Sequence, residues 1–87
     1  MSARERIEQR LAALSPESVA LVDDSQKHAG HAGAQGGGGH YELIIVAHAF
    51  EGKSLLARHR MVYEALQDLL RRDIHALSIK AYTPREI

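Results

Sequence analysis

The chain has 87 residues, of which 45% are hydrophobic, and its 11 basic and 11 acidic side chains give a formal net charge of zero. This length allows one small hydrophobic core, so we expect a single domain spanning residues 1–87. The balanced charge argues against a dedicated nucleic-acid-binding protein, which normally carries a strong positive field. The chain has no cysteine, which excludes a disulfide, a thiol nucleophile and a metal cluster ligated by its own thiolates.

No segment approaches the roughly 20 apolar residues that span a bilayer, and the N-terminal residues are charged where a signal peptide would be apolar. We therefore expect a cytoplasmic protein that makes no membrane contact. Six histidines in so short a chain are the one compositional oddity. Histidine is the commonest metal ligand in proteins, so metal binding has to be considered.

The N-terminal residues predict a helix and a strand. Ser2-Ala3-Arg4-Glu5 has the form of a capping box, which predicts a helix from about Ala3 to Leu14. Pro16 ends this helix because proline excludes the helical conformation from the preceding residue. Residues 19–22 form a short, partly β-branched run before an acidic turn, which predicts a strand.

The segment 26–39 differs in composition from the rest of the chain. It contains His28, His31 and the four glycines Gly36–Gly39, with no side chains able to form a core. We therefore expect a flexible His/Gly-rich loop. Its glycines lead into a strand rather than a helix, which argues against a phosphate-binding loop.

Three further elements follow the loop. Residues 41–47 are apolar on both alternating faces, which predicts the central strand. Ser54 is a good N-cap for a long helix that we expect to end near Arg71 or Arg72. Residues 74–82 alternate between apolar and polar side chains and predict a third strand. The order α-β-β-α-β predicts a three-stranded mixed sheet covered on one face by helices, with the first two strands antiparallel and the last two parallel.

The long helix carries an apolar stripe. Five residues recur at spacings of four and three and therefore share one side of the helix: Leu55, His59, Val62, Leu66 and Leu69. Arg58 and Arg60 are expected to face water. An isolated histidine on such a stripe is more often a hydrogen-bonded packing residue than a ligand, so we interpret His59 as structural.

Several motifs occur together in an order and spacing that resemble one protein family. They are Ser25-x-x-His28-x-x-His31, His40-Tyr41, Phe50-x-Gly52-Lys53-Ser54, Arg58-His59-Arg60-x-Val62-Tyr63-x-x-Leu66 and Ile74-His75-Ala76-Leu77. On these motifs, which cover nearly the whole chain, the sequence resembles the BolA family. The resemblance implies a class II KH-like α/β (α+β) domain. We assign structural roles to Gly52 and Tyr63 within it, and we interpret His40 as a hydrogen-bonding residue at the start of its strand.

The resemblance also implies a function and a set of ligands. BolA-like proteins form heterodimers with monothiol glutaredoxins, in which a [2Fe-2S] cluster is bridged by a glutaredoxin cysteine, a glutathione thiol and histidine from the BolA-like chain. Carried over residue by residue, the strand ligand is His75. The loop ligand is open, because counting forward from Ser25 favours His28, whereas counting back from His40-Tyr41 favours His31, which we prefer. The isolated chain is expected to hold no cluster and to be a monomer or a weak homodimer.

The donor chemistry is consistent with this implication. A cluster iron accepts imidazole in place of thiolate, and exchanging two thiolates for neutral histidines raises the reduction potential. Because the chain has no cysteine, every thiolate would come from outside it. By alternation His75 shares a face with Leu77 and Ile79, so a purely structural edge histidine is the alternative interpretation.

A second hypothesis is a nucleic-acid-binding transcriptional regulator of stress responses and cell morphology, because some members of the BolA family are linked with such control. The candidate contacts with DNA or a partner are Lys53, Arg58 and Arg60, although basic residues on a helix face often serve only solvation. The G-x-x-G turn of RNA-binding KH domains is absent. An enzyme is the least supported class, since no nucleophile and base occur at a recognisable spacing.

Overall fold

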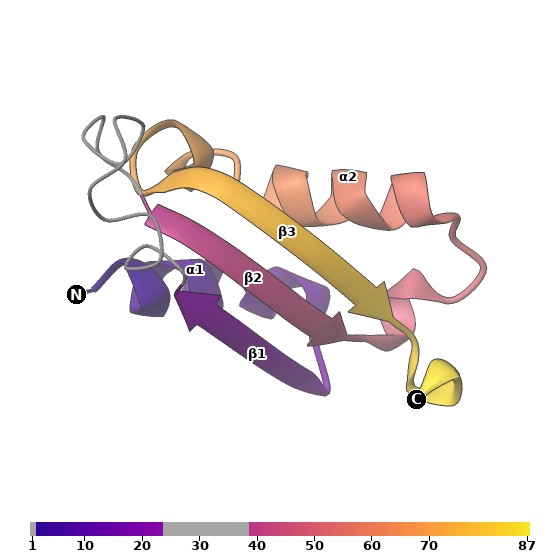
Figure 1. Cartoon of the computed structure of the whole chain (residues 1–87). Helices are drawn as coiled ribbons and strands as arrows, with labels where there is room; N and C mark the ends of the chain where they lie inside the picture. The colour runs from indigo at the N-terminus through magenta and orange to yellow at the C-terminus, as the bar shows by residue number, and fades with distance from the viewer. Residues whose placement is uncertain (1, 24–38) are drawn as a thin grey trace.

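A computed structural model of the chain describes residues 2–23 and 39–87. The helices and strands follow in the order α1 (Ala3–Leu11), β1 (Ser18–Asp23), β2 (Gly39–Val46), α2 (Leu55–Ala65) and β3 (Ile74–Tyr82) (Figure 1). The predicted order and the bounds of the third strand are confirmed. The predicted loop 26–39 lies outside the described residues except for its last glycine, so its flexibility stays a prediction.

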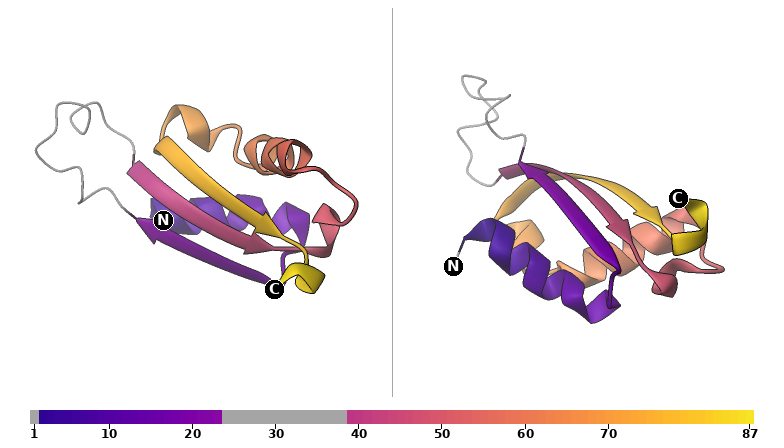
Figure 2. Two further views of the ribbon diagram at one scale, coloured as in Figure 1. Left: turned by 45° about the vertical axis from the view of Figure 1, so that its right-hand side comes forward. Right: turned by 90° about the horizontal axis from the view of Figure 1, so that it is seen from below.

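The strands form one mixed sheet in the order β1-β2-β3. β1 pairs with β2 in antiparallel orientation, and β2 pairs with β3 in parallel orientation, as predicted. Both helices lie on the same face of this sheet (Figure 2). The arrangement therefore confirms the mixed three-stranded sheet covered on one face, and it agrees with the class II KH-like fold that the resemblance implies.

The hydrophobic core fills the space between the helices and the covered face of the sheet. Alternate residues of β2 point inward, and Tyr41, Leu43 and Ile45 are all buried. The other two strands and the helical segments complete the core with the following buried residues: Ile7, Leu11, Leu21, Phe50, Val62, Leu66, Leu69, Ile74 and Ala81.

The N-terminal helix begins with the predicted capping box. The Ser2 hydroxyl accepts a hydrogen bond of 3.2 Å from the backbone N–H of Glu5, whose carboxylate accepts one of 3.2 Å from the backbone N–H of Ser2. After α1 the chain continues as a 3-10 turn (η1, Ala12–Leu14) and then leaves the helix at Ser15. The predicted helix from Ala3 to Leu14 is thus present, with its last turn tightened.

The second helix is shorter than predicted. Ser54 caps it as expected, because its hydroxyl accepts a hydrogen bond of 3.1 Å from the backbone N–H of Ala57. However, α2 ends at Ala65, and the chain reaches β3 through turns and a 3-10 segment (η5, Leu69–Arg71). The prediction of a helix to Arg71 or Arg72 is therefore wrong. An apolar spacing of three residues also fits a 3-10 turn, so the sequence pattern continues past the end of the helix.

The inward face of α2 is displaced from the predicted stripe. Val62 and Leu66 are fully buried as expected, but Leu55 is 68% exposed and His59 is half-buried. Arg58, by contrast, is only 7% exposed. The prediction that Arg58 faces water is therefore wrong: it lies one turn before Val62, so the two side chains share the inward face of the helix.

Arg58 is tolerated there because each nitrogen of its guanidinium donates a hydrogen bond. It donates hydrogen bonds of 3.0 Å each to the carbonyl oxygens of Lys53 and Ala81, and it forms an ion pair of 2.7 Å with Glu86. Glu86 belongs to the last 3-10 turn (η6, Pro84–Glu86). The hydrogen bonds from Arg58 and from the backbone N–H of Thr83 lower the pKa of Glu86 to about 2. Arg58 thus fastens the end of the chain to the start of α2.

Candidate metal-ligand site at the start of β3

His75 is the second residue of β3, and its side chain is exposed. The pairing with β2 shifts at this point, since Gly39 pairs with Ile74 and His40 pairs with Ala76. His75 is therefore the extra residue of a β-bulge, a feature that often re-aims a side chain beside a functional site. The bulge interrupts the alternation, so that Ile74 and Leu77 both face the core while His75 and Ala76 are both exposed. The expectation that His75 shares a face with Leu77 and Ile79 is therefore wrong.

The imidazole of His40 lies beside that of His75. The ring centroids are 5.1 Å apart, and the ring planes are tilted by 41°. The sequence interpretation of His40 as a hydrogen-bonding residue at the start of its strand did not foresee this pair. The signal was nevertheless present, because residues that begin two parallel neighbouring strands meet at the same end of a sheet.

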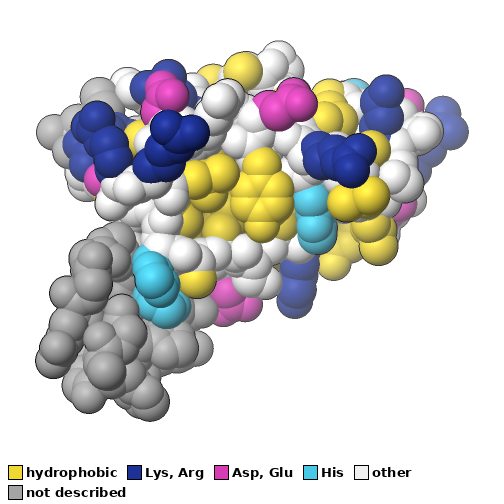
Figure 3. All heavy atoms as spheres, turned by 90° about the horizontal axis from the view of Figure 1, so that it is seen from above, with side chains coloured by type: hydrophobic (Ala, Val, Ile, Leu, Met, Phe, Trp, Pro, Cys, Tyr) yellow, Lys and Arg dark blue, Asp and Glu magenta, His cyan; other side chains and the backbone are white. Residues whose placement is uncertain are grey.

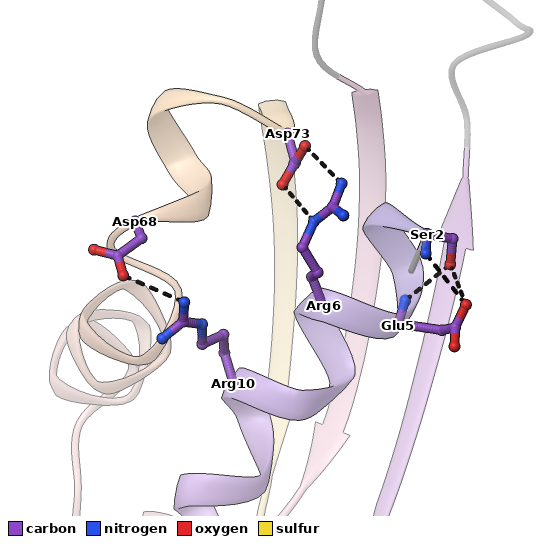
Figure 4. A network of polar contacts seen from close by, with 6 residues as sticks. All are labelled: Ser2, Glu5, Arg6, Arg10, Asp68 and Asp73. Atoms are coloured by element: carbon purple, nitrogen blue, oxygen red, sulfur yellow. Dashed lines mark hydrogen bonds and ion pairs between the residues drawn. The ribbon is translucent and has the colours of Figure 1, made fainter.

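An ion pair from α1 holds the segment that leads into this site. Arg6 donates through Nε to Asp73 Oδ2 at 3.0 Å and through Nη2 to Oδ1 at 3.2 Å, as Figure 4 shows. This hydrogen bonding is the main cause that lowers the pKa of Asp73. The carbonyl oxygen of Asp73 in turn accepts a hydrogen bond of 2.9 Å from the N–H of Gly39. The starts of β2 and β3 are thereby fixed to each other and to α1.

Gly39 is required where the chain enters β2. A Cβ atom at this position would lie 2.5 Å from Tyr41 Cε2, and real Cβ atoms essentially never approach another heavy atom so closely. The Tyr41 ring is buried and has little room to move. A glycine here therefore lets the chain pass close to the Tyr41 ring at the start of β2.

Both predicted loop ligands, His28 and His31, lie outside the described residues. The described residues on either side of this part of the chain are Asp23, which ends β1, and Gly39, which begins β2. Asp23 pairs with Tyr41 near the start of β2. From His31 to Gly39 there are eight residue steps, which span at most about 27 Å when extended. Chain length therefore allows either histidine to reach His75, and it does not choose between them.

The described residues do not form a complete metal site. Within residues 2–23 and 39–87, no group of three or more His, Cys, Asp or Glu side chains could hold a metal ion. His75 and His40 offer two neighbouring imidazoles, which suit a borderline metal such as iron. Any further ligands at this place would come from outside the described residues.

The predicted basic contacts are only partly on the surface. Lys53 and Arg60 are exposed, whereas Arg58 points into the fold. Gly52 has a backbone φ of 74°, and the N–H of Lys53 donates a hydrogen bond of 3.1 Å to the carbonyl of Phe50. These features make residues 50–53 a type II turn, which favours glycine at its third position because φ is positive there.

His59 and Tyr63 lie outside the buried core. Tyr63 is 41% exposed, and His59 lines a surface groove rather than packing inside. A structural role for either residue would therefore be exerted at the surface of α2.

None of the helices in the described part of the chain is long and apolar enough to cross a membrane.

The comparison with protein families identifies the fold's relatives. Residues 11–86 match the family model described as "BolA: BolA-like protein". The chain belongs to the BolA-like family. The bulged histidine and the motifs around it therefore lie within the matched region.

Solved structures of this family agree with the fold. The BolA domain of SufE1 from Arabidopsis thaliana superposes with a TM-score of 0.83 at 44% identity, covering 100% of this BolA-like chain and 99% of that one. BolA1 from Arabidopsis thaliana gives a TM-score of 0.84 at 34% identity, covering 100% and 98%. The order of helices and strands is therefore that of known BolA domains.

Curated relatives extend the comparison to longer proteins. This chain is 46% identical to SufE-like protein 1 of Arabidopsis thaliana, covering 100% of the chain but 24% of that protein. It is 43% identical to BolA-like protein 1 of Mus musculus, covering 95% of the chain and 56% of that protein. The "DNA-binding transcriptional regulator BolA" of Escherichia coli is 39% identical, with 99% and 80% covered. The chain thus spans well under two thirds of several relatives, and the matched family is not one named for an enzyme.

Proposed function

We propose that this BolA-like chain is a non-enzymatic partner of a monothiol glutaredoxin and supplies histidine to a shared [2Fe-2S] cluster in iron-sulfur trafficking or iron and redox sensing. His75 is the assigned strand ligand, and His28 or His31 the loop ligand. The glutaredoxin cysteine and glutathione supply the thiolates, because this chain has none. When bound, the cluster provides a redox-active and transferable iron centre.

The observation that carries the proposal is the exposed His75 on its bulge. A purely structural edge histidine gains nothing from being turned away from the core, whereas a ligand to a shared metal has to face a partner. The bidentate Arg6–Asp73 pair limits motion of the backbone two residues earlier. A fixed backbone at Asp73 limits the directions in which the His75 side chain can extend.

His40 enters the proposal as a further candidate ligand. Its ring is 5.1 Å from that of His75, a separation within which two imidazoles can approach one metal ion after modest side-chain rotation. The proposal therefore has three candidates for the second histidine: His28, His31 and His40.

Reconstitution tests the proposal. The chain is mixed with a monothiol glutaredoxin, glutathione, ferrous iron and sulfide, and the visible absorption, the circular dichroism and the EPR spectrum of the reduced sample are recorded. We expect a heterodimer whose spectra differ from those of the glutaredoxin homodimer, and we expect His75→Ala to abolish the difference. His48→Ala is the matched control, since His48 is also well exposed but follows the opposite end of β2.

Single substitutions of the three remaining candidates identify the second ligand. His28→Ala, His31→Ala and His40→Ala are compared in the same reconstitution, and the variant that alters the cluster spectrum marks the ligand. If the spectrum of the complex is unchanged in His75→Ala, or is changed equally in His48→Ala, the ligand assignment is refuted.

A second candidate function is DNA binding, which the name of the Escherichia coli relative favours. In this chain the exposed Lys53 and Arg60 lie near the start of α2 and could contact phosphates, whereas Arg58 is directed inward. Neutral net charge predicts weak and strongly salt-dependent binding. Cluster ligation and DNA contact are not exclusive.

A gel-shift series at increasing salt tests this candidate. The double variant Lys53→Gln/Arg60→Gln should lose binding to duplex DNA, while Arg72→Gln, which removes an exposed charge elsewhere, should retain it. Absence of any shift with the unmodified chain at low salt would end the DNA-binding candidate without affecting the cluster proposal.

A further inference from the structure

A surface groove runs along the outer edge of β3, remote from the histidine pair. It has a volume of about 360 Å³ and is lined by Leu55 and His59 of α2 and by residues 79–82 of β3. Side chains of a strand alternate between faces, so four consecutive residues can line one groove only along the edge of the strand. The groove therefore combines a backbone edge with an apolar helical wall.

The backbone groups on this edge can be identified from two hydrogen bonds. The carbonyl of Tyr82 accepts from Ala47, after the end of β2, whereas the carbonyl of Ala81 accepts from Arg58 on the opposite side. Successive carbonyls of a strand point to opposite edges. Leu77 and Ile79 therefore direct their N–H and C=O groups outward, and in the described part of the sheet β3 has β2 as its only neighbouring strand.

The accessible part of this edge is short and bounded. His75 forms a bulge at one end, and at the other end Arg58 occupies the carbonyl of Ala81. Bulges and cations are devices that protect edge strands from indiscriminate pairing. They leave a window between Leu77 and Ile79 that has room for a few residues of an added strand.

The side chains around the window specify what could bind. Leu77 and Ile79 face the helix layer, where Leu55 is 68% exposed. Lys80 faces the opposite side of the strand and is exposed. Figure 3 shows apolar side chains gathered in a band across the face that carries α2 and the outer edge of β3, with basic and acidic side chains around it.

We propose that the edge of β3 at Leu77 and Ile79, which continues into the groove at Ile79, binds an extended peptide segment of a partner protein, which adds to β3 as a short fourth strand. Residues of the segment opposite Leu77 and Ile79 lie on the side of the helix layer, and the one opposite Ile79 enters the groove beside Leu55, so they are apolar. Residues between them share the side of Lys80, so they are acidic. The recognised chemistry is thus an alternating apolar-acidic strand, held by backbone hydrogen bonds and one apolar anchor.

Two classes of occupant are set aside by these features. If a second copy of β3 paired with this edge, Lys80 would lie opposite an apolar or neutral residue. The second strand contains no acidic residue that could pair with it. A single-stranded nucleic acid would use the basic side chains but would gain little from the exposed Leu55. The acidic, alternating peptide uses the edge, the apolar wall and the lysine together.

The test uses the full chain and a fluorescein-labelled synthetic peptide, Gly-Val-Asp-Val-Asp-Val-Gly. Fluorescence anisotropy should show saturable binding with a Kd of roughly 10–300 μM, because the contact is much smaller than a standard interface. Two control peptides should bind at least about tenfold more weakly. One has the same composition with the three valines adjacent, and the other carries N-methyl groups on the valines and the aspartates, so it cannot donate to the strand edge in either strand direction.

Matched substitutions in the chain locate the binding site. Leu55→Ser should weaken binding about fivefold or more by removing the apolar anchor. Leu56→Ser is the control, because Leu56 is 61% exposed but does not line the groove. Lys80→Glu should weaken binding of the acidic peptide and favour a version with lysine in place of aspartate. These exposed residues can be changed with little effect on folding.

Amide hydrogen exchange supplies the backbone readout. In the free chain, the outward N–H groups of Leu77 and Ile79 should exchange faster than those of Ser78 and Lys80, and the peptide should slow them. Equal binding of the N-methylated peptide, equal effects of Leu55→Ser and Leu56→Ser, or protection of Leu77 and Ile79 that rises with chain concentration alone would overturn the proposal. Displacement of the peptide by oligo-dT at equal concentration would also overturn it, since nucleic acid would then be the preferred occupant.

Discussion

Replacing Arg58 by methionine tests whether this residue belongs to the fold or to a binding surface. Methionine keeps an unbranched apolar stem beside Val62 and removes the guanidinium. The carbonyl oxygens of Lys53 and Ala81 then lose their donors, which now lie at 3.0 Å each, and Glu86 loses its ion-pair partner. The substitution should therefore destabilise the chain even though a buried charge has been removed.

The magnitude follows from how deeply each bond is buried. A charge-assisted hydrogen bond to the buried Ala81 carbonyl contributes about 2 kcal/mol, and the part-buried bond to Lys53 contributes about 1 kcal/mol. The free energy of unfolding should therefore fall by about 3 kcal/mol. This sum leaves out the lost ion pair with Glu86. For a domain of this size, about 4–8 °C per kcal/mol corresponds to a fall in Tm of about 12–24 °C.

Urea unfolding followed by circular dichroism measures this free energy, and a thermal scan measures Tm. Arg60→Met is the control, because Arg60 is an exposed arginine on the same helix, and it should change stability by less than about 0.5 kcal/mol. An unchanged m-value would show that the denatured state is comparable. If Arg58→Met and Arg60→Met were equally stable, the assignment of Arg58 to the interior of the fold would be refuted.

Three further predictions concern acid stability, the turn and the bulge. The pKa of Glu86 is lowered from 4.5 to about 2. The stabilising effect of its carboxylate is therefore complete above pH 4.5 and is lost as the pH falls toward 2. The Tm difference between the unmodified chain and Glu86→Gln should shrink over that range. Gly52→Ala should cost about 1 kcal/mol in urea unfolding because φ is 74°, and Gly52→Asn should cost less, since asparagine tolerates this conformation better. His75→Ala should change stability by less than about 0.5 kcal/mol because the side chain is exposed, and a larger loss would favour a structural role.

Local sequence signals predicted the elements of this fold well where the stabilising partners are close in sequence. The capping box at Ser2 and the N-cap at Ser54 each act over three residues, so they are visible in the sequence. The alternation likewise reports burial on one face of β3 from Leu77 to Ala81, although the bulge at His75 interrupts it before that point. The parallel and antiparallel pairings followed from the order of helices and strands alone.

The failures concern partners that are distant in sequence. Arg58 was expected in solvent because a charged side chain normally lies on the protein surface. Its carboxylate partner, Glu86, is 28 residues away in the sequence, so no local pattern indicated the ion pair. The neighbouring rings of His40 and His75 depend on the strand register and on a bulge. Neither a register shift nor a bulge has a sequence signal that is independent of the partner strand, so the pair could not be assigned from the motifs.

Arg58 also connects the stability of the fold to the edge of β3. Its bond to the Ala81 carbonyl closes one end of the window at Leu77 and Ile79, so Arg58→Met should leave three outward carbonyls along β3 instead of two. At a temperature where the variant remains folded, the alternating peptide should therefore bind it at least as tightly as the unmodified chain. A direct contact between Arg58 and the peptide would instead require weaker binding. Anisotropy titrations of the two proteins at the same temperature separate a residue that limits the edge from one that recognises the partner.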